Sequence, residues 1–309
     1  MTDAEREEIK QKLISLAKNE IIITYDAPTS LLPATATRIG GVPAVPKDFE
    51  WPRHAHTRIR DWLASLVRRV IPGLSAGSPR RELPLAFLGQ INLKDAAPYD
   101  VDGLLPKSGV LSFFLDPSAG GSDASDRGAA RVYYFPDEAA LTTVANFPDD
   151  LDDERKFPEL APGFMCKTSM PECDEYAFLT NDDRDWGEEC DDFNQCRSEC
   201  GFVEFEERGR FKLLGYPRFI GDFWPDTMEG ICESNSGANR GRGGAGETEE
   251  AFNERAKEWT LLLEADKIDR KMNKVSAFFE PAGKFYFWIR KEDLRNLNFE
   301  NVWLISYFY

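Results

Sequence analysis

Five of the six cysteines are clustered in one segment of the chain, where closely spaced thiols could bind a metal. They are Cys166, Cys173, Cys190, Cys196 and Cys200. The spacing Cys190-x5-Cys196-x3-Cys200 lacks the C-x2-C pair that zinc sites usually show, and no histidine lies nearby. We therefore expect reduced thiols, no metal and no cofactor, with zinc bound by Cys190, Cys196 and Cys200 as the alternative.

Histidine offers a second set of possible ligands, but the chain has only His54 and His56. On a strand, this His-x-His spacing would place both rings on one face. No carboxylate or third histidine follows at a spacing that would complete a metal site. We expect these two side chains to face solvent.

Motifs for nucleophilic or phosphate chemistry are missing from the sequence. It has no G-x-S-x-G elbow, no G-x-x-x-x-G-K-[ST] loop and no G-x-G-x-x-G after a strand. We therefore predict no catalytic residues and favour a binding protein, with an enzyme as the alternative. A carboxylate pair could still perform acid–base chemistry. The first candidates for it are Asp266, Asp269, Asn92 and Asp95.

Acidic side chains dominate the segment that holds the cysteines. Residues 149–207 contain 20 Asp and Glu against 5 Lys and Arg, a local charge of −15 in a chain of net charge −16. Such a field repels nucleic acid and attracts basic partners, so we expect no direct nucleic-acid binding. A solvated loop that only aids solubility is the alternative.

The acidic segment predicts a contact surface for a basic protein, because opposite charge speeds the encounter and fixes its orientation. The predicted acidic contacts are Asp182, Asp183, Asp185, Glu188, Glu189, Asp191 and Asp192. We expect Trp186 and Phe193 to act as apolar anchors within this surface.

Periodicity indicates both helices and strands. Thr2-x-x-Glu5 has the form of a capping box and predicts a helix from there to about residue 18. A basic amphipathic helix is expected at 58–70, and a flexible glycine-rich loop at 237–246. Apolar runs predict strands at 21–25, 85–93, 109–115 and 131–135.

The second half of the chain repeats the first at a constant offset of 174 residues. Over the windows 38–50, 85–95 and 109–115, 8 of 31 positions are identical without a gap. In both halves a helical stretch, 58–70 or 247–258, lies between a Gly-Pro turn and two aromatic-rich strands. We predict two matched units, approximately 30–135 and 204–290.

These motifs resemble those of the YwqG-like family, a bacterial family of unknown function. The resemblance begins with Ile39-Gly40-Gly41-x-Pro43-x-x-Pro46, Trp51-Pro52 and Leu88-x-Gln90-Ile91-Asn92. It continues through Leu105-Pro106-x-x-Gly109-x-Leu111-x-Phe113-Phe114, Lys212-Leu213-Leu214-Gly215-Tyr216-Pro217, Trp259-x-Leu261-Leu262-Leu263 and Asp293-Leu294-x5-Phe299-x2-Val302. A Trp-Gly-Asp that commonly precedes the last Gly-led strand in this family is here Phe279-Glu280-Pro281-Ala282-Gly283. The resemblance implies a β-rich α+β fold and, for some members, immunity to a toxin.

We therefore predict one α+β domain over 1–309, with an acidic, cysteine-bearing insertion at 149–203. The start of the chain has no signal-peptide pattern and no apolar run nears the roughly 20 residues of a membrane span. A cytoplasmic protein with no membrane contact is expected. The predicted function is neutralisation of a cognate bacterial toxin, with a basic toxin that acts on nucleic acid as the expected partner. The alternative is an enzyme or small-ligand protein with a site between the two halves.

Overall fold

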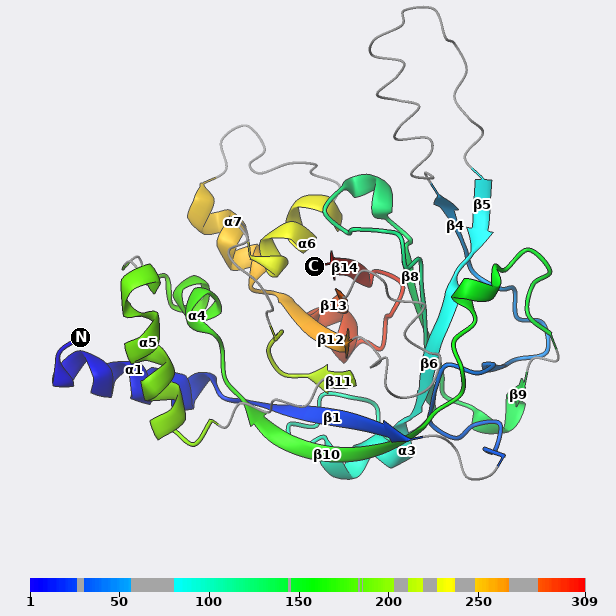
Figure 1. Cartoon of the computed structure of the whole chain (residues 1–309), viewed down its shortest axis with the longest axis horizontal. Helices are drawn as coiled ribbons and strands as arrows, with labels where there is room; N and C mark the ends of the chain where they lie inside the picture. Colours follow the sequence, from blue (N-terminus) through cyan, green and yellow to red (C-terminus); the bar gives the residue numbers. More distant parts are fainter. Residues whose placement is uncertain are drawn as a thin grey trace, which may run out of the picture.

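The chain folds around two antiparallel sheets with helices on the outside (Figure 1). The computed structural model describes residues 1–26, 31–56, 81–143, 146–182, 184, 186–202, 211–218, 227–236, 248–266 and 283–308. The mixture of helices and antiparallel sheets confirms the α+β class. No helix in the described ranges is long and apolar enough to cross a bilayer.

Sheet A has six strands in the order β10-β1-β11-β12-β13-β14. Their bounds are β1 Lys18–Asp26, β10 Ala161–Ser169, β11 Phe211–Leu214, β12 Trp259–Asp266, β13 Gly283–Arg290 and β14 Trp303–Phe308. Every neighbouring pair is antiparallel. The expected strand at 21–25 lies within β1, and β10 comes from the acidic segment, where no strand was expected.

Sheet B has four strands in the order β2-β6-β7-β8, again antiparallel. Its strands are β2 Arg38–Ile39, β6 Ala86–Asn92, β7 Val110–Leu115 and β8 Ala130–Phe135. The last three confirm the strands predicted from apolar runs. The described residues also form two small strand pairs: β3 Ala44–Val45 with β9 Thr142–Thr143, and β4 Arg53–His56 with β5 Arg81–Pro84.

The helices fall into separate groups (Figure 1). Helices α1 (Asp3–Leu16), α4 (Cys173–Thr180) and α5 (Trp186–Glu199) form a small bundle beside sheet A. Helices α6 (Met228–Ser236) and α7 (Glu249–Ala256) pack together, and α6 covers one face of sheet A. The short α3 (Leu93–Ala96) and α8 (Lys291–Arg295) follow β6 and β13 directly. Among the described residues, 3-10 turns lie at Ala97–Tyr99, Ala124–Asp126, Glu138–Ala140 and Asp153–Arg155.

Local sequence signals account for the start of two helices. Thr2 and Glu5 form the predicted reciprocal capping box of α1, which satisfies two backbone donors that a helix start leaves open. Thr248 caps α7 by accepting from the Ala251 backbone N–H. Helix α7 confirms the helical stretch expected at 247–258. The expected helix at 58–70 and the loop at 237–246 lie outside the described residues.

One hydrophobic core joins the two sheets. Side chains of β1, β11, β12 and β13 pack into the same cluster as those of β2, β6, β7 and β8. Phe113 of β7 meets Phe287 of β13 edge to face, with ring centroids 5.5 Å apart. Such a contact contributes beyond simple area burial. The sheets are therefore packed as one body around a shared interior.

The 174-residue offset also relates the strands of the two sheets. The order β2-β6-β7-β8 in sheet B matches β11-β12-β13-β14 in sheet A. The pair Arg38↔Gln90 corresponds to Lys212↔Glu264. The register shift between Phe87 and Gly89 recurs between Leu261 and Leu263, again 174 residues later. Strand order and the register of the first three strands thus share one offset, whereas β14 is displaced by two residues against β13 (Lys284↔Tyr307, where Val110↔Phe135 would give Tyr309).

Candidate functional site

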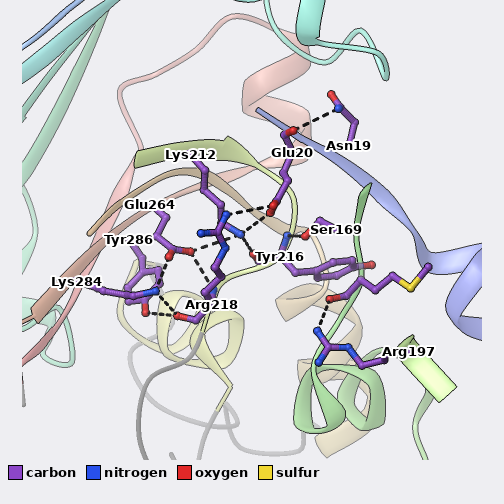
Figure 2. Close-up of polar contacts among 11 residues, drawn as sticks. Asn19, Glu20, Ser169, Arg197, Lys212, Tyr216, Arg218, Glu264, Lys284 and Tyr286 are labelled. Atoms are coloured by element: carbon purple, nitrogen blue, oxygen red, sulfur yellow. Dashed lines mark hydrogen bonds and ion pairs between the residues drawn. The ribbon is translucent and has the colours of Figure 1, made fainter. Parts of the chain in front are cut away.

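A row of buried charges crosses one face of sheet A (Figure 2). It consists of Glu20 on β1, Lys212 on β11, Glu264 on β12 and Lys284 on β13, so acid and base alternate from strand to strand. Lys212 Nζ lies 2.9 Å from Glu20 Oε2 and 3.6 Å from Glu264 Oε2. Lys284 Nζ lies 2.7 Å from Glu264 Oε1. Pairing of this kind is what makes burial of the four charges tolerable.

The charged row also holds the turn that follows β11 (Figure 2). Lys212 donates to the backbone carbonyl of Tyr216. Glu264 accepts from the backbone N–H of Arg218 at 2.9 Å, while Lys284 and the Tyr286 hydroxyl both donate to the Arg218 carbonyl. These bonds fix the backbone between residues 214 and 218 against the sheet.

Glu264 is the electrostatic centre of this network. Burial by itself would raise the pKa of its carboxyl group, but Lys284, Lys212 and Arg218 outweigh burial and lower the pKa to about 2. The carboxylate therefore stays ionised across the physiological range. It has direct hydrogen-bond partners on both oxygens.

Sheet B has a related set of contacts around its own Gly-Pro turn. Arg38 pairs with Glu159 (Nη1–Oε2 2.6 Å) and donates to the Val42 carbonyl at 3.5 Å. Gln90 Oε1 accepts from the Ala44 backbone N–H at 2.8 Å. The counterparts of Arg38, Val42, Ala44 and Gln90 at the 174-residue offset are Lys212, Tyr216, Arg218 and Glu264. In both sheets a cation and an amide or carboxyl group hold the turn, so this part of the network is scaffold.

The turn residues share an unusual backbone conformation as well. Gly41 and Gly215 have φ values of 68° and 72°. A Cβ on Gly215 would lie 2.8 Å from Glu20 Cβ, and one on Gly41 would lie 2.8 Å from Glu159 Oε2. Both positions therefore need glycine, for space and for φ.

A cavity of about 480 Å³ opens beside this second turn. Its apolar lining comes from the loop at 103–106, from Leu214 and from Leu294 and Leu297 around α8. Its charged lining consists of Lys18, Lys291 and Arg295. No carboxylate is among the described residues that line it. The cavity lies between the loop at 103–106 and residues of β1, β11, β12 and α8.

Lys18 connects this cavity to two further acids, of which Glu229 is buried and Glu175 half-buried. Its Nζ lies 3.8 Å from the centre of the Tyr216 ring. Burial lowers the pKa of Lys18, while Glu175 on α4 and Glu229 on α6 oppose that shift. Burial raises the pKa of both acids, and of Glu229 well above its ordinary value. Within the described ranges, Glu229 Oε2 is buried without a hydrogen-bond partner. Shifted pKa values in a lysine that lines a cavity and in two acids that interact with it are typical of a functional site.

The predicted acidic contact surface is only partly available. Trp186 and Phe193, the predicted apolar anchors, are buried with Tyr176 and with Ile9 of α1 and do not lie open to a partner. The apolar face of α5, which carries these aromatic residues, packs against other helices of the same chain and not against a partner. Asp192 pairs with Arg6 (3.0 Å) and with the N-terminal amine (3.2 Å).

Other members of the predicted surface have varied surroundings. Asp182 pairs with Arg184 at 2.9 Å, Glu189 is half-buried and Asp191 is exposed. Asp183 and Asp185 lie outside the described residues, and Glu188 is described only in its backbone. Asp191 and Glu189 therefore remain the best-supported candidates for contact with a partner.

The alternative zinc ligands are not brought together. Cys196 and Cys200 point to the backbone carbonyls of Arg6 and Lys10 on α1, at 3.9 and 3.8 Å. Cys190 instead lies against Cys173, with the two sulfurs 3.1 Å apart. No group of three His, Cys, Asp or Glu side chains suited to a metal occurs among the described residues.

The histidine prediction also needs correction. His54 is buried, and its Nδ1 lies 3.1 Å from Asp116 Oδ2. Asp116 Oδ1 is in turn 3.2 Å from Arg155. His54 comes from β4 and Asp116 follows β7, so the pairing depends on tertiary structure that the His-x-His spacing does not encode. The side chain of His56 is not described.

The suggested acid–base candidates serve structural roles where they are described. Asn92 caps α3 by accepting from the Lys94 N–H at 3.0 Å. Asp95 accepts from the Thr37 hydroxyl at 2.7 Å. Asp266 is described only in its backbone, and Asp269 lies outside the described residues.

The fold and site define a two-sheet α+β protein with a cationic cavity and an internal charge network. The sequence matches a family described as a domain of unknown function, DUF1963, over residues 37–306. The chain belongs to this family. No curated protein matches it.

Proposed function

We propose that the protein binds a small organic anion with an apolar part in the cavity beside Gly215. The observation that carries this proposal is the cavity lining: three cationic side chains and no described carboxylate, in a chain of net charge −16. Three cations close together attract anions through their local field, although the rest of this acidic chain repels them.

The size and walls of the cavity narrow the class of ligand. About 480 Å³ lies within the range of small-molecule sites. Leu104, Leu105, Leu214 and Leu294 supply apolar contacts on several sides. An anion beside Lys18 would favour the ammonium form of this lysine, whose pKa burial lowers. A carboxylate or phosphate with an apolar body fits these surroundings.

We also propose that the two sheets are copies of one unit, in agreement with the YwqG-like resemblance. The shared strand order, the shared register shift and the matching polar contacts support this. Phe113 and Phe287, which meet in the core, are themselves 174 residues apart. Contact between equivalent residues is expected where two copies meet about a two-fold axis. On this proposal the cavity, lined by Gly103–Pro106 from the first unit and by Leu214, Gly215 and Thr260 from the second, is the candidate for a ligand site between the two units.

The cavity proposal predicts a loss of affinity when a lining cation is removed. The probe is 8-anilinonaphthalene-1-sulfonate, an amphipathic anion that fluoresces in apolar sites. Lys291→Met should weaken its binding about tenfold, because one charge-assisted contact contributes roughly 1.5–3 kcal/mol. Lys47→Met, at an exposed lysine away from the lining residues, is the matched control and should leave affinity unchanged. Equal affinity of wild type and Lys291→Met would refute the assignment.

A second function, immunity to a basic toxin in the cytoplasm, is favoured by a separate observation. An open groove of about 880 Å³ runs between the end of α4 and the start of α7. Its lining includes Asp182, Glu249 and Glu250 and no described cation. These acids suit a protein with a basic, nucleic-acid-binding cleft, and exposed Asp191 on α5 is a further acidic side chain that could serve it.

Charge reversal tests this second function on a cognate toxin found bound to the protein. Changing Glu189, Asp191, Glu249 and Glu250 to lysine should weaken that complex at least tenfold and reduce its dependence on salt. The matched control reverses four acidic residues elsewhere on the exposed surface, at Asp48, Glu50, Glu292 and Glu300. If both quadruple variants lose the same affinity, net charge and not this surface is responsible.

A further inference from the structure

The contact between Cys173 and Cys190 has no counterpart among the other cysteines. Their sulfurs lie 3.1 Å apart although the residues are 17 positions apart in sequence. Cys173 is the first residue of α4, and Cys190 lies in the first half of α5. Both side chains are half-buried, so a small reagent can reach them.

The packing of the two helices holds the sulfurs in place. Tyr176 of α4 contacts both Trp186 and Phe193 of α5, with ring centroids 5.5 and 5.1 Å apart. Trp186 and Phe193 also contact each other at 5.0 Å. These three buried aromatics fix how α4 lies on α5 and therefore set the distance between the thiols. A disulfide, with an S–S bond of about 2.05 Å, requires a closure of only about 1 Å.

We propose that Cys173 and Cys190 form a redox-active thiol pair that closes to an intramolecular disulfide when it meets a peroxide. The inference is independent of the ligand cavity. The pair bridges two helices of the acidic segment, so its oxidation would fix the chain between residues 173 and 190, which contains most of the predicted acidic contact surface.

The geometry assigns different roles to the two sulfurs. Asn194 Nδ2 approaches Cys190 Sγ at 3.6 Å and can donate to it. Burial, together with the contact to Cys190, raises the pKa of Cys173 to about 12, so Cys173 stays a thiol. Cys190 is therefore the sulfur that attacks first, and Cys173 is the one that resolves.

The reaction with hydrogen peroxide balances in two steps. The Cys190 thiolate attacks one peroxide oxygen, the O–O bond breaks, and the released hydroxide takes a proton to become water. Cys190 is then a sulfenic acid. Cys173 sulfur attacks Cys190 sulfur, the S–O bond breaks, and the departing hydroxide takes the Cys173 proton to form a second water. Both sulfurs are oxidised and one peroxide is reduced.

Peptide mapping of the full-length protein tests the proposal. After one equivalent of peroxide and alkylation under denaturing conditions, four of the six cysteines should carry the alkyl group. Cleavage after Arg184 separates Cys173 from Cys190, so a disulfide between them joins two tryptic peptides. Because this measurement uses the wild-type protein, it tests the disulfide even if a cysteine variant fails to fold. Six alkylated cysteines, or a disulfide between another pair, would overturn it.

Variants separate the two roles. In Cys173→Ser, dimedone should label Cys190 as a trapped sulfenic acid, whereas Cys190→Ser should show no label at Cys173. The control Cys166→Ser, at an exposed cysteine on β10, should form the disulfide as wild type does. Oxidised wild type should also melt several degrees higher than reduced protein, with the gain lost on adding a reductant. Labelling of Cys173 in place of Cys190 would reverse the assigned order and contradict the mechanism.

Discussion

Replacing Glu264 by glutamine is expected to lower the free energy of unfolding by about 3–5 kcal/mol, because it leaves buried cations without their counter-ion. Lys212 and Lys284 both pair with this carboxylate and both are almost fully buried. After the change, Glu20 would be the one remaining acid in the row. Urea unfolding followed by tryptophan fluorescence measures the loss.

The same carboxyl group predicts how stability depends on pH. Its pKa is about 2 in the folded protein against an ordinary value of 4.5. A group whose pKa is lowered by folding stabilises the protein above the unfolded-state pKa, and this contribution disappears as pH falls through the folded-state value. The shift corresponds to about 3 kcal/mol, lost between about pH 4.5 and pH 2. In Glu264→Gln, this part of the acid sensitivity should be absent.

Sheet B supplies a control for the Glu264 prediction. Its residues at the positions equivalent to Glu264 and Lys284 are Gln90 and Val110, and Gln90 still accepts a backbone N–H from its turn. Adding Lys284→Val to Glu264→Gln removes one unpaired cation. We therefore expect the double variant to be at least about 1 kcal/mol more stable than Glu264→Gln alone. If the double variant loses as much stability as Glu264→Gln and Lys284→Val lose separately when added together, an unpaired Lys284 is not the cause of the loss.

Apolar runs and a capping motif in the sequence predicted those strands and helix ends that depend on neighbouring residues alone. The strands at 85–93, 109–115 and 131–135 have apolar runs with breaks at both ends, and β6, β7 and β8 occur there. Thr2 and Glu5 form their capping box because all of its atoms come from a single turn of chain. Such signals depend little on the rest of the fold.

The charge network and the cavity could not be predicted in this way. A lysine or glutamate within a strand resembles a solvent-facing residue, and nothing local shows that Lys212 and Glu264 lie opposite each other. Burial of α5 against α1 joins segments more than 180 positions apart in sequence. The cations of the cavity, Lys18 and Lys291, come from opposite ends of the chain. Only register and packing bring these groups together.

The 174-residue offset was the exception, because it carried long-range information. The offset relates Arg38 to Lys212 from the sequence alone. In the structure, both residues hold a Gly-Pro turn by donating to the backbone carbonyl four residues ahead. A repeat states that two distant segments share an environment. It therefore indicated which residues would have equivalent contacts, and that the duplicated parts serve as scaffold.

Replacing Gly121 by alanine is expected to be among the most destabilising single changes, at more than about 4 kcal/mol. A Cβ there would lie 1.8 Å from the Leu304 carbonyl oxygen and 2.7 Å from Ile305 Cα, so two backbones would collide. The residue also has a φ of 81°, which disfavours any side chain. Its carbonyl accepts from Trp303 Nε1 at 2.8 Å, so a shift of this loop would break a buried hydrogen bond as well.

A second glycine, Gly201, is a control that separates the steric clash of an added Cβ from the cost of placing alanine at a positive φ. Its φ is 86°, but a Cβ there would meet no atom within 4 Å, so Gly201→Ala should cost only about 1–2 kcal/mol. Because β14 is an edge strand, the Gly121→Ala protein can relieve the collision by releasing β14 from the loop at 120–121. Hydrogen exchange should then show faster exchange for amides of β14, including Ser306, while β6 and β7 stay protected. Equal losses of stability in the two alanine variants would mean that β14 does not pack on this loop as described, and that the two sheets are joined mainly through the core around Phe113 and Phe287.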